Sequence, residues 1–104
     1  MTDIRAILQM SQQMQGRLAA MQTELASKVV TGTAGAGMVV ITADGRGQVR
    51  NVKIDPSVLA GDVEMLEDLV LAAMNEVQKR AGDIAQEEAK KLQSALPFPL
   101  PFPL

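Results

Sequence analysis

The fold is decided by residues 28–55, which read KVVTGTAGAGMVVITADGRGQVRNVKID. β-Branched residues dominate this stretch, and glycines divide it into three predicted strands at 28–31, 38–42 and 48–54. Asp44 and Gly45 form a strong hairpin signal between the last two strands. The middle strand is apolar on both faces, so we expect it to be covered on both sides. These features predict a small antiparallel sheet.

Long amphipathic helices are predicted on either side of this segment, at residues 2–27 and 62–95. In the first helix, apolar residues recur at alternating spacings of three and four, as in a heptad seam. Thr2 and Asp62 are suitable N-caps. The predicted packing and dimer residues are Ile4, Ile7, Met14, Leu18, Met21, Leu25, Val39 and Ile41.

The sequence therefore predicts an α+β domain at residues 1–95, with long N- and C-terminal helices flanking the sheet. A helix of about 32 residues is about 48 Å long, whereas a compact domain of about 100 residues has a radius of gyration of about 13 Å. The helices must extend beyond their own core. We expect their apolar stripes to be covered by a second subunit, which predicts a homodimer with projecting helical arms.

Composition argues against an enzyme. The sequence has no His and no Cys, which removes the commonest general base and the usual zinc ligands. The glycine-rich stretch at 32–37 lacks the Gly-Lys-Ser/Thr ending of a phosphate loop, and Glu64, Glu67 and Asp68 suit the positive end of a helix dipole. We predict no catalytic residue, no metal, no cofactor and no small-molecule substrate.

Charge and hydropathy limit the location and the partners. The first residues lack the basic start and apolar run of a signal peptide, and no run of 18 apolar residues exists to span a membrane. We therefore expect the cytoplasm. The formal net charge is −2, with +2 on residues 1–55 and −4 on residues 56–104. The chain therefore lacks the excess of basic residues that is usual in domains that bind duplex DNA.

The C-terminal segment, residues 96–104, reads LPFPLPFPL and contains both aromatic residues of the chain. Its four prolines exclude helix and favour extended polyproline II. Two interpretations stay open, a disordered end without a role or a segment that docks through Phe98 and Phe102 on a groove of its own dimer, a neighbour or a partner.

Two motifs resemble one known family. Residues 30–39, VTGTAGAGMV, are similar to a V-x-G-x-(A/S)-G-x-G-x-V block. Residues 52–57, VKIDPS, together with EMLEDLV at 64–70 and AAMN at 72–75, resemble a second, more specific block. These blocks are typical of the YbaB/EbfC family of bacterial nucleoid-associated proteins, and the resemblance covers about residues 4–93.

The resemblance implies a tweezer-like homodimer of α-β-β-β-α subunits in the cytoplasm and nucleoid. It also implies binding of double-stranded DNA with low sequence specificity, organisation of the nucleoid and regulation of gene expression. DNA contacts are expected on the helical arms, whose basic residues here are Arg5, Arg17, Lys79, Arg80, Lys90 and Lys91. The alternative is a protein-interaction module whose arms or Pro/Phe tail bind a protein partner, with only indirect effects on DNA.

Overall fold

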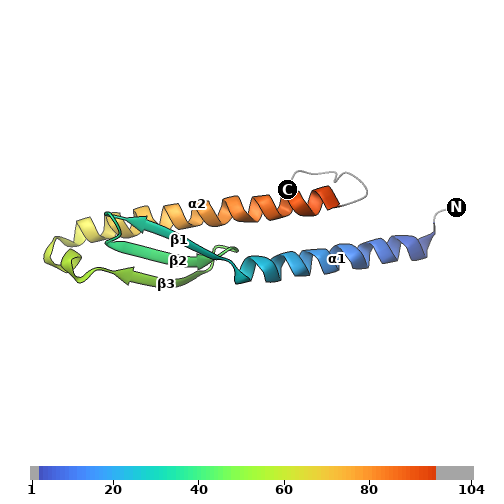
Figure 1. Cartoon of the computed structure of the whole chain (residues 1–104), viewed down its shortest axis with the longest axis horizontal. Helices are drawn as coiled ribbons and strands as arrows, with labels where there is room; N and C mark the ends of the chain where they lie inside the picture. Colours follow the sequence, from blue (N-terminus) through green and yellow to red (C-terminus); the bar gives the residue numbers. More distant parts are fainter. Residues whose placement is uncertain (1–2, 96–104) are drawn as a thin grey trace.

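A computed structural model describes residues 3–95 of the chain (Figure 1). Its elements follow the predicted α-β-β-β-α order, which confirms the α+β fold class. A short 3-10 helix, which the sequence analysis did not predict, connects the sheet to the second long helix. The elements are α1 (Ile4–Ser27), β1 (Val29–Ala34), β2 (Val39–Asp44), β3 (Val49–Ile54), η1 (Pro56–Ala60) and α2 (Val63–Ala95).

The three strands form an antiparallel meander in the order β1-β2-β3. Gly32 of β1 and Val52 of β3 lie opposite Ile41, so all three belong to the same face of the sheet. The β2–β3 register shifts between Thr42 and Ala43. A shift of this kind is a bulge, which twists a strand pair locally.

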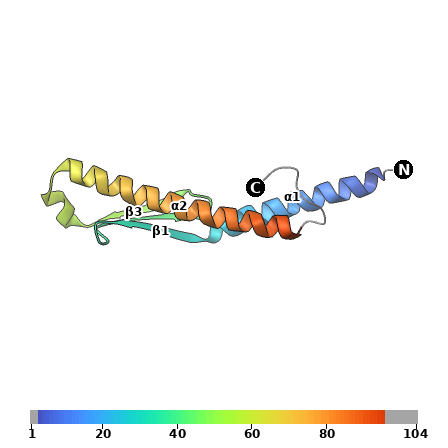
Figure 2. The ribbon, with the colours of Figure 1, turned by 90° about the horizontal axis from the view of Figure 1, so that it is seen from above.

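Helix α2 covers one face of the sheet, and the core lies between them (Figures 1 and 2). The buried apolar residues of this core are Val30, Val39, Ile41, Ala43, Ala73, Val77 and Ala81. Within residues 3–95 no helix lies over the opposite face, where Val40 and Thr42 are half-buried. Within the subunit the prediction that β2 is covered on both sides is therefore confirmed for one face only, because the single long helix packs on that face.

Gly32 explains how closely α2 approaches the sheet. A Cβ atom placed on Gly32 would lie 2.6 Å from the backbone nitrogen of Val77 and would also clash with the carbonyl oxygen of Ala73. The glycine-rich segment thus permits a close approach of backbones, and β1 continues past Thr31 to Ala34. The following turn has positive φ at Gly35 (62°), Ala36 (56°) and Gly37 (91°).

The N-terminal end of the first long helix differs from the predicted one. Helix α1 begins at Ile4, and Asp3 rather than Thr2 is its N-cap, because the Asp3 carboxylate accepts a hydrogen bond from the backbone N–H of Arg5 at 3.0 Å. Asp62 caps α2 as predicted, accepting from the N–H of Met65 at 2.7 Å. The C-terminal segment 96–104 lies outside the described residues, so the polyproline prediction is not tested.

Helix α1 is fixed to the sheet at its C-terminal end only. Leu25 is buried, and its carbonyl oxygen accepts a hydrogen bond from the N–H of Gly45 at 2.8 Å, in the β2–β3 turn. From there α1 runs away from the sheet beside the last part of α2 and continues beyond the end of α2 (Figures 1 and 2). The molecule measures 73 × 21 × 16 Å. Neither helix within residues 3–95 is long and apolar enough to cross a membrane.

Candidate nucleic-acid interface

The two helices form an arm that extends beyond the sheet. Val29, the first residue of β1, lies beside Ile84 of α2 around a shared cleft, so the sheet ends at this level of the helix. We call α1 together with the part of α2 after Ile84 the arm. Four predicted DNA-binding residues lie on the arm, namely Arg5, Arg17, Lys90 and Lys91, whereas Lys79 and Arg80 lie beside the sheet.

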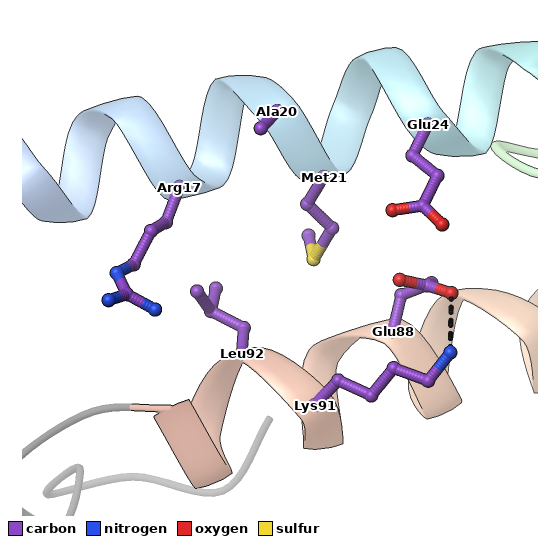
Figure 3. Close-up of a pocket in the computed structure, with 7 residues that line it drawn as sticks. All are labelled: Arg17, Ala20, Met21, Glu24, Glu88, Lys91 and Leu92. Carbon is purple, nitrogen blue, oxygen red and sulfur yellow. Dashed lines mark hydrogen bonds and ion pairs between the residues drawn. The ribbon is translucent and has the colours of Figure 1, made fainter.

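The two helices of the arm face each other across a cleft of about 270 Å³ (Figure 3). Met21 of α1 and Leu92 of α2 project into it from opposite sides. Glu88 is buried there and pairs with Lys28 at 3.6 Å and with Lys91 at 3.2 Å. The hydrogen bond to Glu88 and the charge of its carboxylate raise the pKa of Lys91 above its ordinary value. Through Lys28, Glu88 therefore links α2 to the C-terminal end of α1, whereas Lys91 lies one turn farther along α2 itself.

The ion pairs divide the predicted DNA-binding residues into two groups. Lys91 pairs with Glu88, and Arg80 pairs with Glu76 at 2.9 Å while donating to the carbonyl oxygen of Thr31 at 3.0 Å. A cation that is already paired has less to gain from a phosphate. Within residues 3–95, the cations that form no ion pair are Arg5, Arg17, Lys53, Lys79 and Lys90.

Of the twelve acidic residues of the chain, Glu24, Glu87 and Glu88 lie on the arm, and one cluster lies away from it. Four of them, Asp62, Glu64, Glu67 and Asp68, lie in the first turns of α2 or just before it. This end of α2 lies at the opposite end of the long axis from the N-terminal end of α1 (Figure 1). Within residues 3–95, no three His, Cys, Asp or Glu side chains are arranged to hold a metal ion. The net negative charge of residues 56–104 is thus largely remote from the arm.

The predicted packing residues occupy two different environments. Leu25, Val39 and Ile41 are buried within the subunit itself. In contrast, Ile4, Ile7 and Leu18 are exposed, and Met14 and Met21 are half-buried, so these five form the apolar stripe of α1.

A second apolar surface was missed in the sequence. Val52 and Ile54 lie on the α2 face of the sheet, opposite Ile41 and Val39, yet they are 46% and 37% exposed because α2 lies over β1 and β2. Leu71, which is 60% exposed, lies on the same flank of α2 as Gln78, and Gln78 donates to the carbonyl oxygen of Gly47 at 3.0 Å. This flank therefore faces β3. We call Val52, Ile54 and Leu71 the β3–α2 strip.

The alternation of Val52 and Ile54 with Lys53 is the sequence signal that was available for this strip, since it places both apolar residues on one face. Leu71 gave no signal, because it falls outside the helical stripe of α2 that includes Val70 and Ala73.

These features define an elongated α+β subunit with a two-helix arm. Within residues 3–95 the arm has three cations without an ion pair, and a cluster of four acidic residues lies at the far end of the molecule. The chain belongs to the YbaB/EbfC DNA-binding family, whose family model matches residues 1–96.

Comparisons with individual proteins agree with this assignment. The chain is 42% identical over 103 residues to a nucleoid-associated protein of Gemmatimonas aurantiaca, covering 96% of this chain and 99% of that protein. It is 40% identical over 98 residues to a nucleoid-associated protein of Desulfotalea psychrophila, covering 93% and 92%. The fold is similar to the crystal structure of an uncharacterized protein of Helicobacter pylori, with a TM-score of 0.81, 21% identity and coverage of 88% and 98%.

Proposed function

We propose that this protein is a homodimeric nucleoid-associated protein that binds double-stranded DNA with low sequence specificity. Through this binding it organises the nucleoid, in the cytoplasm, and influences gene expression. The observation that carries the proposal is the uneven charge along the molecule. The arm has a net charge of +1, from four cations against Glu24, Glu87 and Glu88, and the cluster of four acidic residues lies at the opposite end. Phosphate contacts from lysine and arginine supply sequence-independent affinity.

The arm residues Arg5, Arg17 and Lys90 are the principal contacts in this proposal. Lys79 and Lys90 lie about 200° and 220° around α2 from the buried Val77, so both project away from the sheet. They are separated by about 16 Å, or three helical turns, and Asp83 lies between them on the same outer side of α2. Lys91 and Arg80 contribute less, because each is paired with a glutamate.

Low sequence specificity follows from the kind of polar side chains on the arm. The surface of α1 opposite its apolar stripe has Gln9, Gln12 and Gln13 and few charges. Glutamine side chains hydrogen-bond to phosphates and to base edges alike. A long arm with few cations therefore supports weak, salt-sensitive binding to many sequences.

The β3–α2 strip supports the homodimer. Its residues are large, apolar and exposed in the single subunit, and a second copy would remove them from water. Pairing through the β3–α2 strip, which lies toward the end of the molecule opposite the arm, leaves both arms projecting, as in a tweezer.

Fluorescence anisotropy with duplexes of unrelated sequence, each at two salt concentrations, tests the proposal. We expect similar affinity for every duplex and a steep decrease with salt. In the Lys90→Gln variant the slope of log K against log salt should decrease by about 0.9 for each phosphate that the protein no longer neutralises. In contrast, Lys53→Gln, which removes an equivalent exposed charge from the sheet, should leave the slope unchanged. Absence of duplex binding at low salt would instead favour the protein-interaction module.

A further inference from the structure

The apolar stripe of α1 continues beyond the last residue of α2. Met14 and Ile7 lie one and two heptads before Met21, so they project within about 40° of its direction. Met21 faces α2 across the cleft, opposite Leu92 (Figure 3). The side of α1 that α2 covers near Met21 is therefore uncovered farther along, where Ile7 is 52% and Met10 42% exposed.

We propose that the C-terminal segment 96–104 of the same chain packs along this stripe, from the level of Arg17 toward Ile4. Helix α2 ends at Ala95, one turn after Leu92 in the cleft, so the segment begins beside α1. In the extended form favoured by four prolines, its nine residues span about 28 Å. The distance along α1 from Arg17 to Ile4 is about 20 Å. The segment is therefore long enough to reach the N-terminal end of α1.

The composition of the segment matches the surface it would cover. Residues 96–104 are only Leu, Pro and Phe, with no charged or hydrogen-bonding side chain. Packing them on α1 removes apolar surface of both from water. Proline restricts the unbound chain, so that less conformational entropy is lost on docking. Met14 of the α1 stripe and Met10, one turn before it on the same side, have thioethers that make favourable contacts with aromatic rings.

The spacing of the Phe and Leu residues would let one side of the C-terminal segment pack on α1. A polyproline II helix has three residues per turn, so Phe98 and Leu104 share one edge of the segment and Leu96 and Phe102 share the adjacent edge. Both edges can face α1 together. The third edge, with Leu100 between two prolines, then faces solvent.

A single tryptophan reports on this contact, because the chain contains no Trp and no Tyr. In the full-length Phe98→Trp variant, we expect indole emission at shorter wavelength than in a free peptide of residues 93–104 with the same substitution, since docking removes the ring from water. Adding Ile7→Asp should return the emission to the wavelength of the peptide. Gln9→Asp is the matched control, since it places the same charge on the opposite face of α1 and should leave the emission unchanged.

Sedimentation measures the oligomeric state of the Ile7→Asp variant, and we expect it to be the same as that of the wild-type chain. The proposal would be overturned if the Phe98→Trp variant emitted at the wavelength of the free peptide, or if Ile7→Asp left its emission wavelength unchanged. Refolding the Phe98→Trp/Ile7→Asp chain with an excess of the wild-type chain tests whether the contact lies within one chain. Emission that stays at long wavelength supports docking within the chain, and a return to short wavelength would place the segment on a second copy instead.

Discussion

At the scale of single residues, Gly32 and Asp44 determine how the sheet meets the helices. Gly32 has no side chain, and this allows the backbone of α2 to lie against β1. Asp44 is buried in the β2–β3 turn, where one carboxylate oxygen accepts from the N–H groups of Arg46 and Gln48 at 2.9 and 3.1 Å. The other accepts from the Arg50 guanidinium at 2.9 Å. The turn that receives the end of α1 is thus fixed by one charged side chain.

We expect Gly32→Ala to destabilise the protein by about 1–3 kcal/mol, because the new methyl group would force the backbones of α2 and β1 apart. Gly82 is the matched control, since nothing lies within 4 Å of a Cβ placed there. Gly82→Ala should stabilise the protein by about 0.5–1 kcal/mol through its better helix propensity. Urea denaturation measures both, and equal midpoints for the two variants would contradict the close packing at Gly32.

Asp44 makes stability depend on pH. Burial alone would raise the pKa of its carboxyl, but the hydrogen bonds from Gln48, Arg50 and Arg46 hold the pKa below its ordinary value of 3.8. The ionised form is therefore favoured by folding, and its stabilisation is complete above pH 3.8 and lost as the pH falls through the folded pKa. Asp44→Asn should lower the urea midpoint at neutral pH, and its difference from wild type should shrink in acid. A difference independent of pH would argue against this role.

At the scale of elements, the order of helices and strands could be predicted from the sequence because periodicity changes sharply at residues 28 and 62. The strand ends could not. Thr31 was expected to end the first strand because Gly32 disfavours strand, yet the packing of α2 on Gly32 keeps β1 extended to Ala34. A tertiary contact outweighed local propensity there.

The candidate site could be predicted only in part, because ion pairing is not visible in the sequence. The six basic positions were available, but two neighbouring cations can differ completely in their partners. Lys90 has no ion pair within residues 3–95, whereas Lys91 is paired with a buried Glu88. The three-residue spacing of Glu88 and Lys91 suggests a pair, but only the fold brings Lys28 to the same carboxylate.

Glu88 therefore offers a test of the arm as the DNA-binding element. Glu88→Gln removes the carboxylate that neutralises Lys91, so we expect DNA affinity to increase and the salt dependence to steepen. Glu64→Gln makes the same change in net charge at the far end of α2 and should have a smaller effect. Anisotropy titrations compare the two, with circular dichroism to verify that both variants are folded. A larger increase for Glu64→Gln would move the contact surface away from the arm.

At the scale of the whole molecule, the radius of gyration is 19.6 Å, whereas a compact chain of this size has about 13 Å. This confirms that the helices extend beyond their core, as their length predicted. An elongated subunit buries little of its apolar surface. The exposed apolar residues within residues 3–95 include those of the α1 stripe and the β3–α2 strip. Our two proposals assign them to different occupants, the C-terminal segment and a second subunit.

If the β3–α2 strip forms the dimer interface, a charge placed on it should weaken the dimer, whereas a charge placed on α1 should not. Leu71→Asp would bury an unpaired charge between subunits, and a penalty of about 2 kcal/mol or more at such a position weakens the dimer about thirty-fold. Leu8→Asp places the same charge on α1, at a residue of similar exposure, and should leave the dimer intact. Sedimentation velocity over a dilution series measures both.

A monomer has half the phosphate contacts, so Leu71→Asp should also halve the salt slope of DNA binding. A monomer that retains the full slope would show that one arm alone accounts for binding, and the tweezer arrangement would then be unnecessary for function.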